Sequence, residues 1–481
     1  MVKSQAVLGR SATINGELSP ATAFFDVVNP ATGKVFAQAP ACEREHVDQA
    51  MTAARDAFRT WQADDDTRRV ALRAMADTLD AAVGELAPVL TAEQGKPLTE
   101  AHWEIGGAAQ WLRYYADLDL PREVVQDDDS EFVEVIRRPL GVVAAITPWN
   151  YPIMLAMWKI APALRAGNTM VLKPSPFTPL STLALGEIWR EVLPPGVLNV
   201  IAGPDPLGAW MTTHPIPRKI SFTGSTATGK RVAAAAADDL KRVTLELGGN
   251  DPAIVLPDAD PAQIAEKLFW GAFANNGQIC MAVKRVYVSE NQRDELVEAL
   301  AVLARDVVVG DPLSPDTRLG PVNNRPQFDR VSDLVADALA HGAVAAAGGE
   351  ALDRPGYFYA PTILSGAQDG SRIVDEEQFG PVLPVVGYRD LDEVIERVNR
   401  GNYGLTASVW SADVERAAAV SARLDCGQVT VNSHGSAARP HLPFSGHKWS
   451  GVGVENGPWG LYGFTDLQVI ARPATASSSS E

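Results

Sequence analysis

Apolar residues recur at helical spacing over the first quarter of the chain. The spacing predicts helices over Glu43–Arg59 and Asp66–Leu90, both rich in alanine. A third helix is predicted through Trp103, Trp111 and Tyr115, and we expect these aromatic side chains to pack into a core. The segment from about 44 to 117 is therefore predicted to be helical.

The pattern changes to alternation in residues 121–140. Apolar and polar residues alternate around Phe132–Ile136, after the acidic run Asp127–Asp129. This alternation predicts a β-hairpin with an acidic tip. A core does not obviously need the hairpin, so we expect it to contact another subunit. A last extended stretch is predicted over Phe464–Ala471.

From residue 141 onward, short apolar runs alternate with helical segments. The predicted strands are 141–146, 169–173, 197–201, 219–222, 252–256, 285–289 and 405–409. The predicted helices include one through Trp158 and Leu164 and those over 183–192, 231–240, 261–273, 292–307, 327–341 and 392–399. Such alternation predicts an α/β fold with a doubly wound parallel sheet and a second α/β block. Ligands bind these sheets at the carboxyl ends of the strands.

Composition excludes several classes of function. The formal net charge of −17 argues against binding to nucleic acid or to an anionic membrane surface. The start of the chain has no apolar core of a signal peptide, and no apolar run approaches the ~18 residues of a membrane span. The 3 cysteines are far apart and fit a reducing, cytoplasmic setting. Histidine is scarce and shows no HExxH spacing, so we expect no metal.

Cys280, in the stretch NNGQICMA, is the candidate nucleophile. A thiol attacks as thiolate, so it needs amide donors, a base or a positive field nearby. The competing interpretation is a buried structural cysteine, which is the commoner fate of a lone cysteine. The octapeptide alone favours burial, and the rest of the chain decides between the two.

Polar residues at three strand ends suggest a site. Glu246 ends an apolar strand, where burial would raise its pKa and suit it to be a general base. Asn150 follows another strand and offers an amide donor for an oxyanion. The turn Thr223–Lys230 resembles a P-loop, but Arg231 stands where a magnesium-binding Ser or Thr belongs. That turn still suits a pyrophosphate, because a helix N-terminus favours anions. The alternative for Glu246 and Asn150 is local hydrogen bonding, and the alternative for the turn is an ordinary βα turn. Lys173, at another strand end before Pro-Ser-Pro, could hydrogen-bond a ribose or a phosphate, and its alternative is a solvated surface lysine.

Seven ordered motifs resemble those of the aldehyde dehydrogenase superfamily and cover nearly the whole chain. They are TPWNYP (Thr147–Pro152), KPSPFTPL (Lys173–Leu180), FTGSTATGK (Phe222–Lys230), LELGGN (Leu245–Asn250), NNGQIC (Asn275–Cys280), EEQFGPV (Glu376–Val382) and PFSGHKWSG (Pro443–Gly451). The order of the set is far more specific than any one motif.

The resemblance implies a domain plan. A Rossmann-like NAD(P)-binding domain would span 1–120 and 141–247, and a catalytic domain 248–430. An oligomerisation flap would combine 121–140 with 460–473 in a homodimer or homotetramer, and 474–481 would be a disordered tail.

The resemblance also implies chemistry on named residues. Cys280 would attack the aldehyde, and Asn150 with the Cys280 N–H would hold the oxyanion. After hydride transfer to the cofactor, water activated by Glu246 would hydrolyse the thioester. Lys159 and Glu455 would support proton relay.

The remaining implied residues bind the cofactor or the aldehyde. Those implied for NAD, with NADP also open, are Ile146, Thr147, Pro148, Trp149, Lys173, Ser175, Gly224, Ser225, Leu247, Glu377 and Phe379. Those predicted to line an apolar pocket for a medium aliphatic or aromatic aldehyde are Tyr151, Leu155, Trp158, Ile279, Met281 and Phe444.

Departures from the family pattern leave questions open. Pro176 replaces the acid that disfavours the NADP phosphate, so specificity for NAD alone is in doubt. Asn250 stands where lysine is common, and Ser445 replaces a glycine. Arg439 could bind a carboxylate-bearing semialdehyde, which is the alternative substrate class. A CoA-acylating enzyme is disfavoured by Glu246, and a catalytically idle relative by the intact set of Cys280, Glu246 and Asn150.

Overall fold

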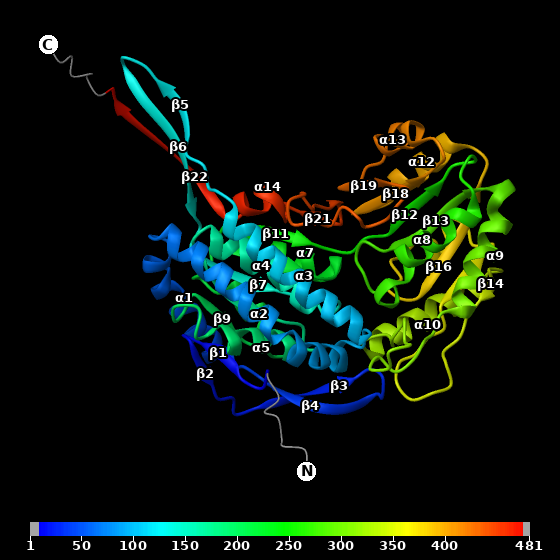
Figure 1. The fold of residues 1–481 in the computed structure, drawn as a ribbon, viewed down its shortest axis with the longest axis horizontal. Coiled ribbons are helices and arrows are strands. Elements are labelled where there is room, and N and C mark those ends of the chain that lie inside the picture. The colour runs from blue at the N-terminus through cyan, green and yellow to red at the C-terminus, as the bar shows by residue number, and fades with distance from the viewer. Residues whose placement is uncertain (1–8, 475–481) are drawn as a thin grey trace.

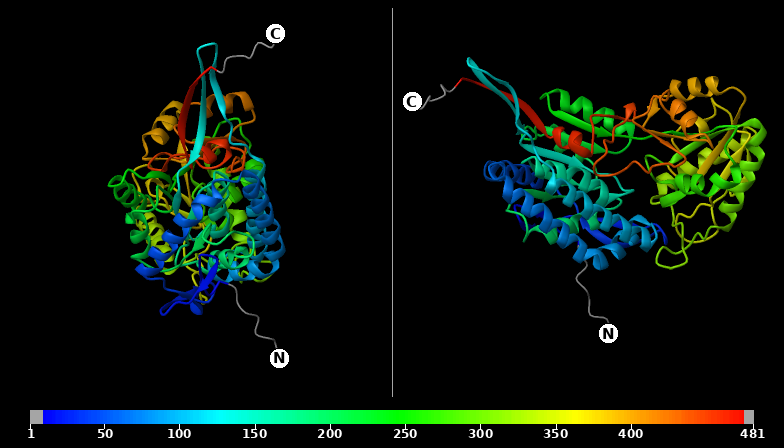
Figure 2. Two further views of the ribbon diagram at one scale, coloured as in Figure 1. Left: turned by 90° about the vertical axis from the view of Figure 1, so that its left-hand side faces the viewer. Right: turned by 45° about the horizontal axis from the view of Figure 1, so that its top comes forward.

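The protein is described here by a computed structural model that covers residues 9–474. Two sheet-centred bodies lie side by side, and a narrow flap projects from the first body (Figures 1 and 2). The predicted disordered tail lies outside the described residues, apart from Ala474.

The first sheet has the order β2-β1-β9-β8-β7-β10-β11-β21, and its five central strands are parallel. Its strands are β1 (Ala12–Ile14), β2 (Glu17–Ser19), β7 (Val142–Ile146), β8 (Thr169–Lys173), β9 (Leu198–Val200), β10 (Lys219–Thr223), β11 (Arg242–Glu246) and β21 (Gly451–Val452). Strands β7 and β8 are almost wholly buried, as the unbroken apolar runs predicted. The chain order reverses between β7 and β10, which is where such folds bind ligands.

Helices cover both faces of this sheet (Figure 1). They are α1 (Arg44–Trp61), α2 (Asp65–Gln94), α3 (Leu98–Asp117), α4 (Pro152–Arg165), α5 (Leu180–Trp189), α6 (Leu207–Thr213) and α7 (Thr226–Ala237). Several predicted helix boundaries are wrong by three residues or more: α2 ends at Gln94 rather than at 90, α5 ends at Trp189 rather than at 192, and α7 ends at Ala237 rather than at 240. Helix α5 begins three residues before 183, and α7 begins at Thr226 rather than at 231. The Ser225 side chain accepts a hydrogen bond from the Thr228 N–H and caps α7, so most of the predicted turn is helix.

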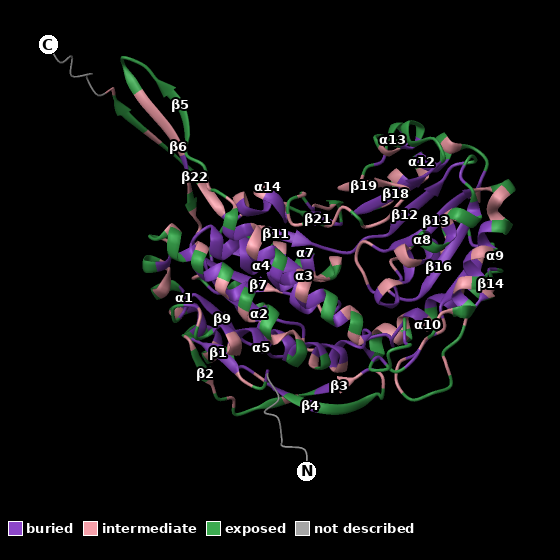
Figure 3. Ribbon diagram, viewed as in Figure 1, coloured by how far each residue is buried: buried purple, intermediate pink, exposed green. Residues whose placement is uncertain are grey.

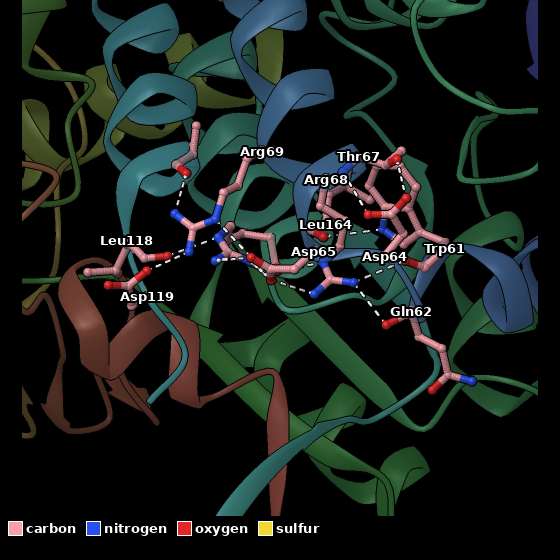
Figure 4. Close-up of polar contacts among 12 residues, drawn as sticks. Trp61, Gln62, Asp64, Asp65, Thr67, Arg68, Arg69, Leu118, Asp119 and Leu164 are labelled. Atoms are coloured by element: carbon pink, nitrogen blue, oxygen red, sulfur yellow. Dashed lines mark hydrogen bonds and ion pairs between the residues drawn. The ribbon is translucent and has the colours of Figure 1, made fainter. Parts of the chain in front are cut away.

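A cluster of charged residues holds α2 against its neighbours (Figure 4). Asp65 accepts hydrogen bonds from Arg68, Arg69 and, at 2.5 Å, Arg165 at the end of α4. Partial burial acts to raise the pKa of Asp65, but the bonds from Arg165 and Arg69 lower it to about 2. The ionised Asp65 carboxylate therefore holds the first turn of α2 to the end of α4 through its ion pair with Arg165.

The second sheet has the order β14-β15-β16-β13-β12-β18-β19 and is parallel except for β14. Its strands are β12 (Asp251–Val255), β13 (Val283–Ser289), β14 (Val344–Ala347), β15 (Thr362–Ser365), β16 (Val382–Tyr388), β18 (Thr406–Trp410) and β19 (Gln428–Val431). Its helices are α8 (Pro261–Phe273), α9 (Glu290–Asp306), α10 (Arg325–Ala340), α11 (Arg372–Asp375), α12 (Leu391–Arg400) and α13 (Val414–Ser421). The inner strands of both sheets form the buried interior, whereas edge strands such as β2, β14 and β19 are partly exposed (Figure 3). The predicted α/β class with a second α/β block is confirmed.

The flap is a three-stranded antiparallel sheet of β5 (Glu123–Asp127), β6 (Glu131–Pro139) and β22 (Thr465–Pro473). The predicted hairpin and the predicted last strand thus pair with each other. Val124, Val125, Leu467 and Val469 are exposed there by more than half. A separate hairpin joins β3 (Phe24–Asn29) and β4 (Lys34–Pro40) beneath the body.

The segment before β22 returns to the first sheet. Strand β21 pairs with β11, and α14 (Gly457–Tyr462) follows it. Strand β17 (Tyr403–Gly404) pairs with β20 (His447–Lys448) on the way. The predicted domain plan left residues 431–459 unassigned, because a short antiparallel strand leaves no periodicity to detect.

One predicted core aromatic is wrong. Trp111 and Tyr115 are buried, but Trp103 is 64% exposed. Its ring packs edge-on against the Tyr151 ring, with 6.4 Å between the ring centroids. It lies on α3 one position away from the buried stripe. Within residues 9–474, no helix is both long and apolar enough to cross a bilayer.

Two helical glycines offer a matched test of the packing. A Cβ on exposed Gly84 meets nothing within 4 Å, whereas one on buried Gly186 lies 2.6 Å from Thr13 Oγ1. Gly84→Ala should stabilise the fold by about 0.5–1 kcal/mol because it reduces backbone freedom in the unfolded chain. Gly186→Ala should destabilise it by about 1–3 kcal/mol through overpacking of α5 on β1. Denaturant unfolding measures both, and equal effects would contradict this packing.

Candidate active site

A cavity of about 420 Å³ lies between the two bodies, where the strands of the first sheet end. One side is formed by the segments after β7, β10 and β11, and the other by the loops that carry Cys280 and Glu377. Its lining is Pro148, Trp149, Asn150, Leu155, Thr223, Gly224, Ser225, Thr226, Ala227, Leu247, Gly248, Cys280, Gln327, Arg330, Glu377, Phe379 and Tyr403. The tertiary structure thus brings Cys280 and Asn150 to one cavity.

The Cys280 loop owes its shape to the three residues before Gln278. Asn275, Asn276 and Gly277 have φ of 48°, 59° and 72°, in the left-handed region that Asn and Gly tolerate best. A Cβ at Gly277 would lie 2.2 Å from Gly380 O. The NNG sequence therefore folds as a tight left-handed turn that delivers Cys280 into the cavity.

Asn150 is fastened to this turn from both of its ends. Its Nδ2 donates to Gln278 O at 3.0 Å, and its carbonyl accepts from Asn275 Nδ2 at 3.1 Å. The same carbonyl accepts from Lys96 Nζ at 2.9 Å. Lys96 in turn forms a fully buried ion pair with Glu104 at 2.5 Å. Asn150 therefore keeps an amide donor beside the Cys280 loop.

Burial dominates the electrostatics of the thiol. It raises the pKa of Cys280 to about 12, and the nearby Lys284 ammonium opposes that rise. Lys284 Nζ donates to the carbonyls on either side of the cysteine, to Ile279 O at 2.5 Å and to Ala282 O at 3.3 Å. Lys284 is not among the residues predicted from the sequence, although a lysine within an apolar strand is a usable signal.

His434 supports the same loop from behind. Its Nε2 lies 2.7 Å from Met281 O and its Nδ1 2.9 Å from Ser408 Oγ. Burial lowers the pKa of His434 to about 4, so the ring is neutral near pH 7. The carbonyl can only accept, so Nε2 carries the proton and Nδ1 accepts from the serine hydroxyl.

Glu246, at the end of β11, is a buried carboxyl group whose two oxygens accept no hydrogen bond from the described residues. Its pKa is raised well above the ordinary range, first by burial and then by the charge of Glu455. Lys159 Nζ binds Glu455 Oε1 and Thr223 Oγ1, each at 2.7 Å. When this group is ionised, its raised pKa makes the carboxylate a stronger base towards water than an ordinary carboxylate is.

One end of the cavity is formed by the segment that opens α7. Gly224 and Ser225 line the cavity just before this twelve-residue helix. Leu247 packs against Gly229, where a Cβ would lie 2.4 Å from the leucine side chain. Free amides at a helix N-terminus suit a pyrophosphate.

Lys173 is 5% exposed, so the solvated-lysine alternative is wrong. Burial lowers its pKa to about 8. Within residues 9–474, the one bond that its Nζ donates is a long one, to Pro174 O at 3.2 Å. The neighbouring Thr147 hydroxyl is buried and bonds to none of the described residues. Ile146, Thr147, Lys173 and Ser175 lie at the strand ends beside the cavity rather than in its lining.

Glu377 and Phe379 form the opposite wall. Glu377 Oε1 accepts from the Gly249 N–H at 3.0 Å, and its other oxygen leaves no space for a Cβ on Gly248. Phe379 has a φ of 52°, and its ring packs edge-on against the Trp149 ring with 5.2 Å between the ring centroids. A helix N-terminus, a buried lysine, a carboxylate and an aromatic wall together fit a dinucleotide. Among the described residues, no three His, Cys, Asp or Glu side chains are grouped to hold a metal ion.

Comparison with known proteins identifies the relatives of this chain. The profile described as Aldehyde dehydrogenase family matches residues 18–470. The chain belongs to the aldehyde dehydrogenase family. The resemblance stated from the motifs is confirmed, and so is the predicted enzyme class, an NAD(P)-dependent aldehyde oxidoreductase.

Individual relatives cover nearly the whole chain. An aldehyde dehydrogenase of a Fusarium species is 40% identical and spans 92% of this chain and 94% of its own. Retinaldehyde dehydrogenase 3 of Homo sapiens is 38% identical, with coverages of 93% and 89%. The NAD+ complex of a Bacillus cereus aldehyde dehydrogenase superposes with a TM-score of 0.95 at 35% identity, with 99% of each chain covered. An E. coli NADP-dependent enzyme also reaches 0.95 at 35% identity, with 98% of this chain and 100% of that chain covered.

Of the six residues predicted to line the aldehyde pocket, one lines the observed cavity. That residue is Leu155. Trp158 and Phe444 are buried, and their rings pack edge-on with 5.0 Å between the ring centroids. Trp158 also stacks on Trp111. The Tyr151 ring lies 3.6 Å from Lys96 Nζ.

The remaining predicted pocket residues lie around the cysteine loop. Ile279 and Met281 are half-buried beside Cys280. Arg439, the candidate for binding a substrate carboxylate, is exposed, and its Nε donates to Ser436 O within its own loop.

Lys284 can be tested through the thiol. Lys284→Met removes the positive charge that lowers the pKa of Cys280, so alkylation at a fixed mildly alkaline pH should slow by roughly tenfold for each unit by which the pKa rises. Iodoacetamide labelling followed by mass spectrometry measures the rate, with Cys42 and Cys426 as internal controls. Lys284→Arg keeps the charge and should label close to wild type. An unchanged rate in the Met variant would refute the electrostatic role.

Proposed function

We propose that this aldehyde dehydrogenase oxidises a medium aliphatic or aromatic aldehyde to its carboxylate with NAD+ or NADP+. The observation that carries the proposal is the meeting of Cys280 and Asn150 in one cavity, with Glu246 buried at the end of β11 and accepting no hydrogen bond from residues 9–474. These are the nucleophile, oxyanion donor and base that thioester chemistry requires. The free thiols Cys42, Cys280 and Cys426 fit a reducing compartment such as the cytoplasm.

The first half of the reaction takes place on Cys280. Its thiolate adds to the aldehyde carbon, and Lys284 favours loss of the thiol proton. The new oxyanion lies where the Asn150 amide and the Cys280 N–H can donate to it. When bound, NAD(P)+ accepts the hydride. The residues proposed to hold the cofactor are the α7 N-terminus at Gly224 and Ser225, together with Lys173, Glu377 and Phe379.

The second half requires a base. Glu246 takes a proton from water, which attacks the thioester and releases the carboxylate. Its raised pKa makes it an effective base near neutrality, because a normal carboxylate would be too weak. Lys159 holds Glu455 next to it and thereby sets the charge that Glu246 experiences.

We further propose the domain plan. Residues 1–120 and 141–247 form the cofactor domain and 248–430 the catalytic domain. The flap of 121–140 and 460–473 joins subunits, and the exposed valines and leucine of its strands support a homodimer or homotetramer.

Glu246→Gln tests the division into two halves. The variant should retain a burst of about one NADH per active site but lose steady-state turnover by about 100-fold or more, because only the second half needs the base. Stopped-flow absorbance measures both. Cys280→Ser serves as control and should lack the burst. Unchanged turnover in the Gln variant would refute the base role, and the same variant distinguishes a CoA-acylating enzyme, which needs no such base.

Pro176 gives a prediction about the cofactor. No acid stands there to repel a 2′-phosphate, so kcat/KM for NAD+ and NADP+ should lie within about 100-fold, a difference of under about 3 kcal/mol. Pro176→Glu should lower kcat/KM for NADP+ by roughly tenfold or more and leave NAD+ nearly unaffected. A wild-type preference for NAD+ of many thousand-fold would contradict dual use.

A further inference from the structure

A separate cavity of about 580 Å³ lies on the other side of the wall that carries Glu377. Four arginine side chains line it: Arg285 of β13, Arg330 of α10, and Arg397 and Arg400 of α12. Exposed residues border the cavity, so it opens to solvent. We call it the arginine cavity. Acidic side chains line it too, so what it can bind depends on which charges are already paired.

Two of the four arginines pair with carboxylates. Arg397 Nη1 donates to Asp369 Oδ2 at 2.5 Å, and Arg330 Nη2 donates to Glu376 Oε2 at 3.1 Å. A hydrogen bond from Arg372, above all, lowers the pKa of Glu376, so this acid is ionised near neutral pH. The charges of these two pairs therefore largely cancel within the wall of the cavity.

Arg285 lies deep in the cavity wall and is only 5% exposed. Its Nε donates to Asn250 O at 3.1 Å, and its Nη1 donates to Tyr287 OH at 3.3 Å. Among residues 9–474, its Nη2 donates no hydrogen bond and no carboxylate pairs with its guanidinium. A guanidinium keeps its charge at any physiological pH, and buried charges are normally paired. Arg285 therefore has N–H groups and a charge left for a ligand.

Gly401 leaves this guanidinium open to the cavity. Its φ of −63° and ψ of 154° suit any residue, so the backbone does not require a glycine there. A Cβ at Gly401 would lie 3.5 Å from Arg285 Nη2, so a longer side chain would cover that nitrogen. Arg400, the preceding residue, is exposed in the last turn of α12 and pairs with no carboxylate of residues 9–474. The two unpaired arginines thus line the same opening.

The two remaining acids of the lining do not neutralise these arginines. Glu377 Oε1 accepts from the Gly249 N–H on the side of the cofactor wall, and burial raises the pKa of Glu377, which favours its neutral form. Asp375 is exposed and accepts from the Gly370 N–H at 3.1 Å. Since neither acid forms an ion pair with Arg285, the inner part of the cavity keeps an excess of positive charge.

We propose that the arginine cavity binds a phosphate group, either as inorganic phosphate or as part of a phosphomonoester, with Arg285 at its floor and Arg400 at its mouth. Guanidinium groups present parallel N–H donors that match phosphate oxygens, and two of them balance a dianion. A volume of about 580 Å³ also leaves room for an organic group attached to the phosphate.

The site is distinct from the cofactor cavity but touches it. The two cavities share Arg330, Glu377 and Tyr403, and their other lining residues differ. Arg330 Nη2 also donates to Glu377 O at 3.0 Å, so an anion that attracts Arg330 acts on the segment that carries Glu377. Phosphate and the dinucleotide should therefore change each other's affinity, and by the same factor.

A structural arginine would make the same two bonds as Arg285, so the variants leave Arg285 in place and alter access to it. Gly401→Leu covers its Nη2, and Gly84→Leu is the control, because Gly84 is an exposed glycine with nothing within 4 Å of its Cβ position. Arg400→Ala removes the outer charge, and Arg400→Lys keeps it. Arg305→Ala is the control for this pair, because Arg305 is an exposed arginine in the last turn of α9.

The measurement is isothermal titration of the full chain, saturated with NAD+ and without aldehyde, at an ionic strength held constant with KCl. NAD+ is included so that its own phosphates occupy the α7 end of the neighbouring cavity. Inorganic phosphate and methyl phosphate are titrated separately, which distinguishes the free ion from a phosphomonoester. A repeat without NAD+ gives the coupling factor.

Wild type should bind at least one of the two phosphates with a Kd of about 1 mM or tighter. Gly401→Leu should weaken binding by at least about tenfold, because it removes access to a buried charged donor. Arg400→Ala should weaken it by about threefold, since this arginine is exposed, and Arg400→Lys should bind close to wild type. Both control variants should bind as wild type, and acetate should bind more weakly than phosphate.

Several results would overturn the proposal. They are no saturable binding up to about 20 mM phosphate, an unchanged affinity in Gly401→Leu, an equal loss in the controls, or acetate bound as tightly as phosphate. If thermal melting shows that Gly401→Leu does not fold, the Arg400 variants and Arg305→Ala decide alone. The proposed oxidation is tested separately by burst kinetics, so its failure and the failure of this site are distinguishable.

Discussion

The whole site depends on one buried contact between the two bodies of the protein. Asn150 exchanges hydrogen bonds with Gln278 and Asn275, and the Lys96–Glu104 ion pair supports its carbonyl. Removing one partner of a fully buried ion pair typically costs about 3–5 kcal/mol, because the other charge is left unpaired. The loop that carries the nucleophile is therefore held against the end of β7 by charges that cannot rearrange cheaply.

Burial then sets the chemistry of every group nearby. It raises the pKa values of Cys280 and Glu246 and lowers those of Lys173 and Lys284, so each group is driven towards its neutral form. Two lysines act against this effect of burial on the acidic groups. Lys284 bridges the carbonyls around the cysteine and favours the thiolate, whereas Lys159 pairs with the second carboxylate beside the base.

The polar face of β10 and β11 extends this principle beyond the cavity. The sheet interior accommodates Lys219, Ser221 and Thr244 because each has a hydrogen-bond partner: Lys219 Nζ donates to Thr244 Oγ1, and Ser221 Oγ donates to Glu455 Oε1. The flap thus has two relations to the body. Its outer strands expose apolar residues, and its base borders a cavity that Lys219 and Thr244 also line.

The sequence by itself determined the α/β class, most strands, the flap hairpin and the family, because apolar runs and ordered motifs are local properties of the chain. It also singled out Cys280, Asn150 and Glu246 as a set. Only the tertiary structure decided that Lys173 is buried, that Trp103 is exposed, and that Lys284 and His434 hold the cysteine loop. Burial and hydrogen-bond partners arise between segments far apart in sequence, and periodicity within one segment carries no record of them. The alternation of polar and apolar residues in β10 is visible in the sequence. Only the structure shows that Ser221 contacts Glu455 and that Lys219 lines the cavity at the base of the flap.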